Sequence, residues 1–504
     1  MIAGSFAEFI QRPDSHKIYL ADMRILRKSA NGTPETYPFY VATEPYFPPP
    51  GSVVDYLEAF DGIPTYQRSA QEVFSGRSFP SFGEMVLVND AGTLDPIFSR
   101  GWTKDQPIIV RLGGPPSELR YPDFGTVFTG IMGMQTNITD KEITIPIFDD
   151  QKKLEIKIPK TTYGVAEYGA TFPTGSEGIP KPIIYGEVHN LKPTLIDQVN
   201  LKYGVAGHPV TQIGTVYDNG IDITSHASID LANATFTLNA RPFGVVTCDV
   251  KGRSTQAGTY TDRLGGILES IVQQEAGYAP SKIDQAALGI LKQQRDVRVG
   301  IAITEQTSVL ESMDKLIAGL LIFYGHNRSG SLDFHKMQKP LNVTPKLIFR
   351  DDVEVLEGFT LELSEPKYKV QLSYDPNETV LQENQTIAGS VSMDRISWLV
   401  QPSRIVAPEN GTVRAFYNYS EAEDPIDTRL LDKSAAQSIA NERLTLLAEE
   451  RKIVRAPFGV QPLQLDMGDV IEFDRSRYNI CGLWAVIGIT ENYVDNSVEL
   501  EIFQ

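Results

Sequence analysis

The side chains in this sequence best placed to bind a metal ion are His326, Asp333 and His335, which flank a Gly-Ser turn. Imidazoles and carboxylates bind zinc when their spacing brings them to one face of an element, as in His-Glu-x-x-His. The spacing here matches no such motif, so polar loop residues are the better interpretation. The other histidines are scattered along the chain: His16, His189, His208 and His226. We therefore predict no metal site and no bound cofactor.

Catalytic motifs are also missing from the sequence. It contains no Gly-x-Ser-x-Gly elbow, no phosphate-binding loop, and no Gly-x-Gly-x-x-Gly after a predicted strand. A carboxylate pair that hydrolyses glycans is defined by its separation in the fold, so the sequence alone leaves such a pair open. Glu269 and Glu275 lie on a predicted helix, where we expect solvated side chains. No catalytic residue is predicted.

The two cysteines, Cys248 and Cys481, are too few for a disulfide framework or a four-cysteine metal site. Because free cysteine behaves as a small apolar residue, we expect both side chains to be buried.

Composition and charge restrict the class of protein further. A chain of 504 residues exceeds one hydrophobic core and predicts several domains. Its net charge of −18, without a basic patch, disfavours a protein that binds nucleic acid tightly. DNA could still pass along such a surface, because the negative charge would repel it and prevent binding. The first residues lack a signal-peptide pattern, and the apolar stretch 316–323 is too short to cross a bilayer. We expect synthesis in a cytoplasm and no membrane insertion.

The elements that position these side chains are predicted to be mostly short strands. The first predicted domain covers residues 1–165. Alternating apolar stretches there predict strands at 18–25, 37–42, 84–88, 107–112, 126–132 and 141–147. No helical crossover separates them, which favours a small antiparallel barrel over a parallel sheet. A proline-rich excursion at 45–82 opens with the sequence PYFPPPG, which we interpret as an extended exposed loop.

A central β module is predicted at 166–260. Residues 161–181 resemble a connector, because they are rich in glycine, proline and threonine. In the module itself, Asn219-Gly220 follows a strand-like stretch, and this dipeptide is a strong signal for a two-residue hairpin turn.

Apolar residues recur at helical intervals between 261 and 339, which predicts a small α/β domain whose apolar face is core. Asp262, Ser281 and Ser308 each precede a helical pattern and are expected to be N-caps. Ser308 and Glu311 have the spacing of a capping box.

The last region, 340–504, is predicted to be a second barrel-like domain with one helix at 434–452, capped by Ser434. It ends in a hairpin of two strands at 484–490 and 498–503. The glycine-containing strand at 124–131, with the strand at 142–147, is similar in pattern to this final hairpin. Chance similarity between two hairpins is an open alternative.

Several phrases of the sequence resemble the baseplate-hub, or tail-tip, proteins of long-tailed bacteriophages. They are YGEVHNL at 185–191, TVYDNG at 215–220 and FTLNARPFGVVTCDVKG at 236–252, together with LDMGDVIEF and GLWAVIGI near the end. The resemblance implies a mainly β fold with two small antiparallel barrels, a central β module and a helical α/β domain. Some tail-tip proteins hold a cysteine-ligated iron–sulfur cluster, and this chain has too few cysteines for one.

The resemblance also implies a non-enzymatic structural role in the virion. A homotrimer of two-barrel chains would present a pseudo-sixfold ring to the tail tube. It would connect the tube to distal tip proteins, tail fibres or a spike. It would also surround the exit route of the tape-measure protein and DNA, which passes without specific binding. Assembly is expected in the host cytoplasm. Two alternatives stay open: a receptor- or carbohydrate-binding tip protein that uses exposed aromatic residues of 37–60, and a tail-associated cell-wall hydrolase.

Overall fold

The structure is a computed structural model. It describes residues 3–12, 14–29, 31–48, 55–62, 65–70, 76–81, 83–341, 343–350, 355–356, 358–382, 384, 390–475, 477–493 and 496–504.

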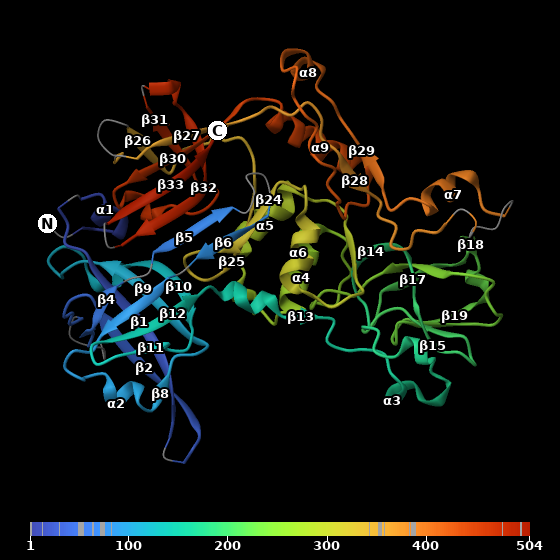
Figure 1. The fold of residues 1–504 in the computed structure, drawn as a ribbon, viewed down its shortest axis with the longest axis horizontal. Coiled ribbons are helices and arrows are strands. Elements are labelled where there is room, and N and C mark those ends of the chain that lie inside the picture. Colours follow the sequence, from blue (N-terminus) through green and yellow to red (C-terminus); the bar gives the residue numbers. More distant parts are fainter. Residues whose placement is uncertain are drawn as a thin grey trace.

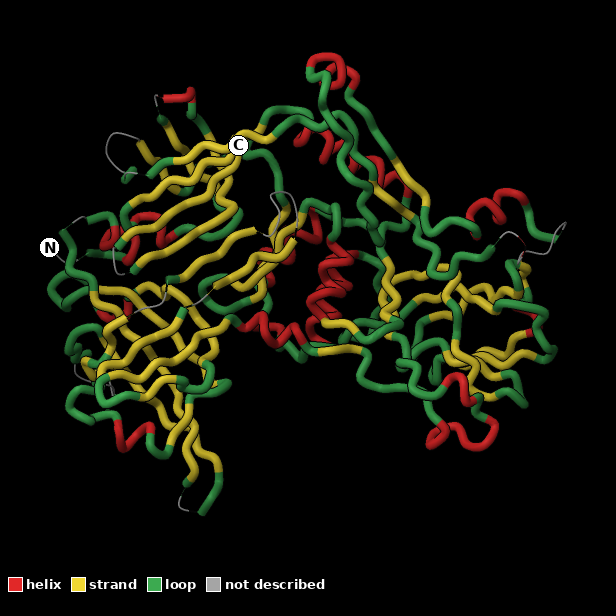
Figure 2. The backbone as a smooth tube through the Cα atoms, viewed as in Figure 1, coloured by secondary structure: helices red, strands yellow, loops and turns green. Residues whose placement is uncertain are grey.

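The described chain is mainly β with a smaller helical part, as predicted. Two curved sheets lie one above the other at one end of an elongated molecule (Figure 1). A helical region occupies the middle, and a β module forms the other end. Figure 2 shows that strands dominate both ends, whereas the longer helices gather in the middle.

The N-terminal sheet contains the six strands predicted before residue 150. Its main path runs β3-β2-β1-β9-β10-β12-β7-β4. The strands are β1 (Ile18–Lys28), β2 (Pro34–Ala42), β3 (Leu57–Glu58), β4 (Phe60–Gly62), β7 (Glu84–Val88), β8 (Gly101–Trp102), β9 (Gln106–Gly113), β10 (Gly125–Met132), β11 (Asn137–Ile138) and β12 (Glu142–Phe148). Helices α1 (Phe6–Ile10) and α2 (Asp95–Phe98) accompany them.

The C-terminal sheet is built around β32 (Leu483–Asn492). This strand pairs with β33 (Ser497–Phe503), β31 (Val470–Asp474) and β5 (Tyr66–Ala70). The sheet also contains β26 (Leu347–Arg350), β27 (Thr360–Ser364) and β30 (Arg451–Phe458). The predicted final hairpin is confirmed by the β32–β33 pairing, although residues 494 and 495 of its turn lie outside the described residues.

The two sheets share an order of four strands. In the first, β9, β10 and β12 form a meander, and the earlier strand β7 pairs antiparallel with β12. In the second, β31, β32 and β33 form a meander, and the earlier strand β30 pairs antiparallel with β33. Thus β10 corresponds to β32 and β12 to β33, which is the correspondence expected from the sequence patterns.

The excursion at 45–82 is not simply an exposed loop. Residues 49–54 lie outside the described residues, but β5 and β6 (Gly76–Ser81) form an antiparallel hairpin. That hairpin joins β32 on one side and β24 (Ile322–His326) on the other. Tyr66 and Arg68 are buried because they face the core between the sheets. The exposed loop expected from the sequence covers only 45–51, of which 45–48 are described; there Phe47 is exposed but Tyr46 is buried.

The central module consists of two small sheets. The first has the order β18-β17-β21-β14-β22, and the second β15-β16-β20-β19. Asn219 and Gly220 have φ of 50° and 87° and connect β17 to β18, so the predicted hairpin is confirmed. The strands are β14 (Ile183–Leu191), β15 (Thr194–Asp197), β16 (Lys202–Gly204), β17 (Gln212–Asp218), β18 (Ile221–Asp222), β19 (Ala227–Asp230), β20 (Thr235–Leu238), β21 (Val246–Lys251) and β22 (Gly300–Ile303). Helix α3 (Val165–Tyr168) precedes it.

The middle of the molecule is the α/β domain. Its elements are α4 (Leu264–Gln274), α5 (Gln285–Gln294), α6 (Val309–Ile317), β24 and β25 (Leu332–Lys336), with a short pair β13 (Lys157–Ile158) and β23 (Thr307–Ser308). The capping box of Ser308 and Glu311 is confirmed.

The other two predicted caps of this domain are wrong. Arg263, not Asp262, is the N-cap of α4, because the Asp262 carboxylate accepts a hydrogen bond from Nε of Arg298 at 2.7 Å. Ser281 lies in a 3-10 turn, and Asp284 caps α5 by accepting from two backbone N–H groups.

Much of the segment 365–447 packs against the α/β domain, whereas Leu446 joins a hydrophobic cluster with Ile453 and Phe503 of the C-terminal sheet. Val370, Leu372 and Leu430 join the hydrophobic cluster of the α/β domain, so clusters of described residues cross the predicted boundary at 339. The elements here are β28 (Leu372–Tyr374), α7 (Met393–Leu399), β29 (Arg404–Val406), α8 (Gly411–Phe416) and α9 (Lys433–Leu447). The division at 165, 260 and 339 stays a prediction.

The predicted helix at 434–452 is too long, and its cap is misplaced. Asp432 is the N-cap of α9, and Ser434 lies in the first turn. Residues 451–458 form β30 instead, because alternate side chains such as Ile453 are buried in the sheet. Of the two cysteines, Cys248 is buried as predicted. Cys481 is exposed because it lies in the loop between β31 and β32.

Candidate functional site at the junction of the two sheets

Arg328 lies in the turn between β24 and β25 and reaches the place where the two curved sheets meet. Its Nη1 donates to the carbonyl oxygen of Val127 at 3.2 Å, and its Nε and Nη2 donate to that of Leu465 at 3.2 and 3.0 Å. A β-bulge between Thr126 and Phe128 leaves Val127 without a partner in the β9–β10 ladder. One side chain of the α/β domain therefore binds the backbone of both sheets.

Glu491 completes this contact from the end of β32. Its side chain is fully buried and forms an ion pair with Nη2 of Arg328. The hydroxyl of Tyr493 also donates to this carboxylate. Burial, reinforced by the charge of Glu491, raises the pKa of Tyr493 well above its ordinary value. Both charged groups are shielded from water. Removal of either one would therefore leave the other buried without a partner and would strongly destabilise the fold.

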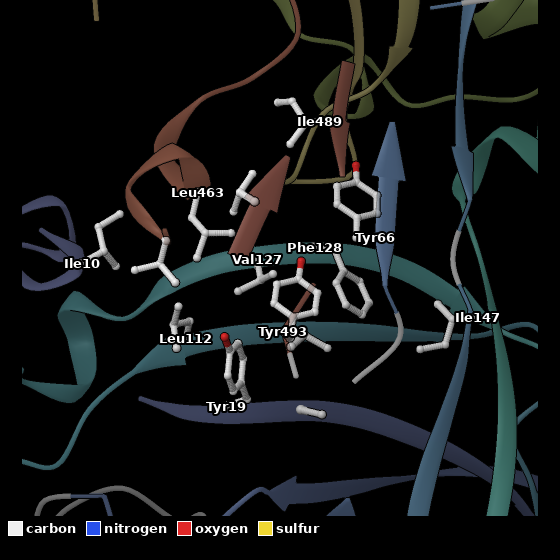
Figure 3. Packing of buried hydrophobic residues seen from close by; sticks show 14 of the residues in the cluster. Ile10, Tyr19, Tyr66, Leu112, Val127, Phe128, Ile147, Leu463, Ile489 and Tyr493 are labelled. Carbon is white, nitrogen blue, oxygen red and sulfur yellow. The ribbon is translucent and has the colours of Figure 1, made fainter. Parts of the chain in front are cut away.

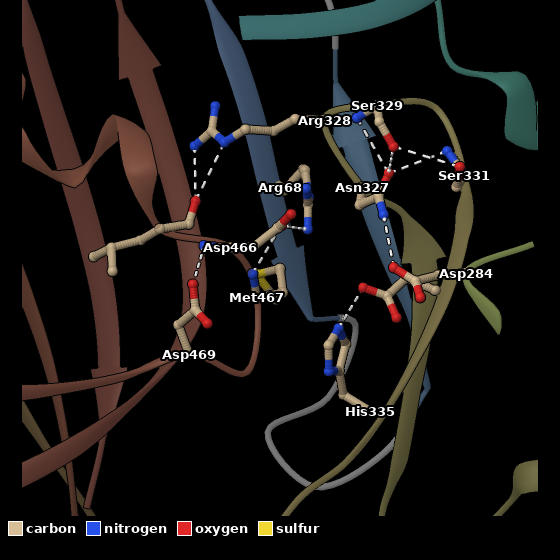
Figure 4. A network of polar contacts seen from close by, with 12 residues as sticks. Arg68, Asp284, Asn327, Arg328, Ser329, Ser331, His335, Asp466, Met467 and Asp469 are labelled. Carbon is tan, nitrogen blue, oxygen red and sulfur yellow. Dashed lines mark hydrogen bonds and ion pairs between the residues drawn. The ribbon is translucent and has the colours of Figure 1, made fainter. Parts of the chain in front are cut away.

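A second ion pair joins Arg68 of β5 to Asp466, which precedes β31 (Figure 4). The carboxylate of Asp466 also accepts from the backbone N–H of Met467 at 2.9 Å. Burial alone would raise the pKa of Asp466, but Arg68 and then Arg328 outweigh it and hold that pKa below its ordinary value. Arg68 thus binds Asp466, and Arg328 binds the carbonyl oxygen of the neighbouring Leu465, so both arginines contact the segment that leads into β31.

The turn that carries Arg328 is held by Asn327. The Asn327 Oδ1 accepts from the N–H of Ser329 at 3.1 Å, from its hydroxyl at 2.7 Å, and from the N–H of Ser331 at 3.1 Å (Figure 4). Gly330 supplies the positive φ of 73° that closes the turn. The position of Arg328 is therefore fixed by its own turn before it contacts the sheets.

Aromatic side chains also pack against one another across the junction of the two sheets. The rings of Tyr19 and Tyr493 meet edge to face at 5.5 Å, and those of Tyr66 and Phe128 stack at 6.0 Å (Figure 3). These residues come from both sheets, and one hydrophobic cluster spans the two. The sheets consequently share a core and form one rigid unit.

The three side chains considered for metal binding, His326, Asp333 and His335, do not form one cluster. His326 is buried, with its Nδ1 3.0 Å from Asp149 and its Nε2 3.0 Å from the hydroxyl of Tyr278. The Nε2 of His335 instead lies 2.7 Å from Asp333. Among the described residues, no group of three metal-binding side chains was found. The two imidazoles have separate carboxylate partners. Their interpretation as loop residues is wrong, because His326 ends strand β24 and His335 lies within strand β25.

The two glutamates considered for glycan hydrolysis are structural as well. Glu269 forms an ion pair with Lys292 at 2.7 Å. Glu275 accepts from the hydroxyl of Tyr185 at 2.8 Å and from Nη1 of Arg253 at 2.6 Å, and its side chain is only 10% exposed. The expectation that Glu275 is solvated is wrong, because the end of α4 packs against β14.

Aromatic residues of the segment 37–60 were considered for recognition of a receptor. In the described part of that segment, Tyr46, Tyr56 and Phe60 are buried, and a cluster of tyrosines and Phe124 packs around Tyr46. Tyr37 and Phe47 remain exposed, at 47% and 69%. Most of these rings therefore support the sheet rather than a ligand surface.

No sequence pattern indicated the junction residues. Arg328, Arg68 and Glu491 are charged side chains in a turn and in two strands, where a solvent-facing position is the ordinary expectation. Within the described residues, no helix is long and apolar enough to span a membrane.

No protein-family model and no curated protein matches this chain. Solved structures similar to it include a chain from the "Virion of native gene transfer agent (GTA) particle", 12% identical over 65% of this chain and 85% of that chain, with a TM-score of 0.44. The tail protein from Neisseria meningitidis MC58 is 8% identical over 96% of both chains, with a TM-score of 0.42.

The 43 kDa tail protein of prophage MuSo2 from Shewanella oneidensis is 11% identical over 97% of this chain and 98% of that chain, with a TM-score of 0.36. These similar structures are two tail proteins, one of them from a prophage, and a virion chain of a gene transfer agent. At these identities and TM-scores, the likeness identifies no equivalent residues.

Proposed function

We propose that this chain is the baseplate hub of a phage-type tail, a non-enzymatic homotrimer that connects the tail tube to distal tip proteins. The observation that carries the proposal is the shared strand order of the two sheets, β7-β12-β10-β9 and β30-β33-β32-β31. Three copies of a chain with two similar sheets would supply six similar units around one axis, which suits a sixfold tube.

The junction supports the same role. A ring that transmits force between a tube and a tip requires its two sheets to keep a fixed relative position. The shared hydrophobic core and the contacts of Arg328 with Val127, Leu465 and Glu491 supply that rigidity. The central module lies at the far end of the molecule, where it would be available to fibres, a spike or other tail proteins (Figure 1).

The net charge suits a channel for DNA. At −18, the chain repels a polyanion, so DNA and the tape-measure protein would pass the ring without specific binding. We place the protein in the tail of the virion, after assembly in the host cytoplasm.

A complementation experiment tests the hub. A phage genome deleted for this chain would be complemented from a plasmid with the wild-type chain or with an empty plasmid. The hub predicts that particles without the chain lack complete tails and are not infectious. Complete, infectious tails formed without it would overturn the proposal.

A second measurement separates the hub from an enzyme. Purified protein would be incubated with peptidoglycan, and released reducing sugars and free amines would be quantified. The hub predicts no turnover above a heat-denatured control. Turnover that disappears on substitution of one carboxylate would favour the hydrolase instead.

A further inference from the structure

The Arg395 side chain is held between the central module and helix α7 by two aromatic rings. Its Cζ lies 4.4 Å from the ring centroid of Tyr217 in β17 and 4.5 Å from that of Trp398, one turn further along α7. Contact of a planar guanidinium with aromatic faces fixes its orientation and leaves only its edges to donate hydrogen bonds.

The nitrogen donors on one edge of this guanidinium bind no other group in the described part of the protein. The Nε and Nη2 atoms of Arg395 are buried and have no hydrogen-bond partner there, and no described carboxylate lies within ion-pair distance. Nε and Nη2 are the two donors on one side of the guanidinium, the pair that binds a carboxylate in bidentate fashion. The Nε1 of Trp398, a residue only 5% exposed, is likewise buried without a partner.

Arg395 and Trp398 line a cavity of about 360 Å³. This volume falls within the range of small-ligand sites, about 300–1,000 Å³. The cavity lies between α7 and the strands β14 and β21, which contribute His189 and Asp249. Three buried donors therefore belong to side chains that line one cavity.

The other cations around this cavity already have a carboxylate partner. The Nδ1 of His189 lies 3.0 Å from Asp375, and Nε of Arg404 lies 3.9 Å from the same carboxylate. Asp249 accepts from the hydroxyl of Tyr217 and from the backbone N–H of Asn190, both at 2.9 Å, and Asp394 is exposed. Among the described cations that line this cavity, Arg395 is therefore the one without an ion pair.

We propose that the Nε and Nη2 donors of Arg395 bind the carboxylate group of a ligand in this cavity, with Nε1 of Trp398 as a further donor. A single negative charge matches the single unpaired cation. The nearby carboxylates Asp249, Asp375 and Asp394 disfavour dianions such as sulfate or phosphate. The carboxylate could belong to a free acid of amino-acid size or to an Asp or Glu side chain of another tail protein. The chemistry is the same for both sources.

The test is titration calorimetry on the purified full-length chain at constant ionic strength. The probes are N-acetyl-alanine, which carries one carboxylate, a short peptide with blocked termini and one central glutamate, and sodium sulfate. Binding of N-acetyl-alanine supports a free acid as ligand. Binding of the peptide alone supports a partner side chain. In either case, sulfate is expected to bind more weakly.

Arg395→Lys keeps the charge but loses the two-donor edge, and it is expected to weaken binding at least about tenfold, the loss of one charge-assisted hydrogen bond. Arg414→Lys is the matched control, because Arg414 lies over the ring of Tyr368 at 5.2 Å but is exposed. If Arg395→Lys does not fold, Trp398→Phe removes the indole donor and should weaken binding by a smaller factor.

Three results would overturn the proposal: no binding of either carboxylate probe to the wild-type chain, equal affinity in the folded Arg395 variant, or tighter binding of sulfate. The proposal does not rest on the hub function, because the isolated chain is measured. A failed hub and a failed carboxylate site therefore give separate results.

Discussion

Arg328 in the β24–β25 turn and Glu491 at the end of β32 form an ion pair whose carboxylate is fully buried at the junction of the two sheets. The same arginine donates to the backbone of Val127 in the first sheet and of Leu465 beside the second. One side chain of the α/β domain thus contacts the backbone of the first sheet and the segment that leads into β31 of the second. Loss of this side chain should loosen the sheets as well as lower stability.

Substitution Arg328→Met should lower the free energy of unfolding by about 3–5 kcal/mol, because it leaves the Glu491 carboxylate buried without its partner. Urea unfolding followed by circular dichroism measures the change. Arg350→Met is the control, since the exposed pair of Arg350 with Asp474 at 3.5 Å should contribute at most about 1 kcal/mol.

The double variant Arg328→Met/Glu491→Leu distinguishes a broken pair from lost packing. With both charges removed, the double variant should be more stable than Arg328→Met alone. If the two substitutions instead destabilise additively, the ion pair is not the important interaction.

His189 predicts a pH dependence of stability. Burial alone would lower the pKa of His189, but hydrogen bonds to Asp375 and Glu187 outweigh it and raise the pKa to about 10. A raised folded-state pKa contributes stability that is fully present below the ordinary value of about 6.5 and is lost as the pH rises through about 10. The stability difference between wild type and His189→Gln should therefore shrink across this interval. A difference that stays constant with pH would contradict the assignment.

Phe128→Ala tests the shared core. The Phe128 ring is fully buried where the sheets meet, so its removal should cost about 3–5 kcal/mol of stability. Phe243→Ala makes the same chemical change at a ring that is 92% exposed, and it should alter stability by less than about 0.5 kcal/mol. Similar effects of the two substitutions on the denaturation midpoint would show that Phe128 is not in a core.

Ser308→Ala removes the cap of α6 and should destabilise the protein by about 1 kcal/mol, since the serine hydroxyl accepts from the N–H of Glu311 at 3.1 Å. Ser434→Ala is the comparison, because Ser434 lies inside α9 and the substitution should be neutral or slightly stabilising. Thermal unfolding of both variants measures the two changes in stability. A larger loss of stability for Ser434→Ala than for Ser308→Ala would indicate that Ser434 is a helix cap after all.

Local patterns predicted local structure well. Alternation located six strands of the N-terminal sheet and the final hairpin of the C-terminal sheet, Asn219-Gly220 located a hairpin turn, and Ser308 with Glu311 located a helix start. Each of these signals depends on residues close together in the chain. The caps predicted at Asp262 and Ser281 were wrong because other side chains intervened. The Asp262 carboxylate accepts a hydrogen bond from Arg298, and Asp284 caps α5 in place of Ser281.

Interactions between distant segments could not be predicted in this way. The insertion of the β5–β6 hairpin between β32 and β24 depends on pairing partners hundreds of residues apart, and a lone strand pattern does not name its partner. For the same reason, Arg328, Glu491 and Arg395 resembled ordinary surface charges. These side chains are removed from water by the packing of separate parts of the chain. The spacing of apolar residues within one segment does not indicate that packing.

The central claim is tested most directly by the symmetry and position of this chain in its native particle, measured by averaging electron micrographs. The proposed hub predicts three copies around the axis at the end of the tail tube. The two sheets of each copy should then alternate around one ring, with β10 and β32 at equivalent positions. A chain located away from the axis, or present in copies that form no threefold ring, would contradict the account.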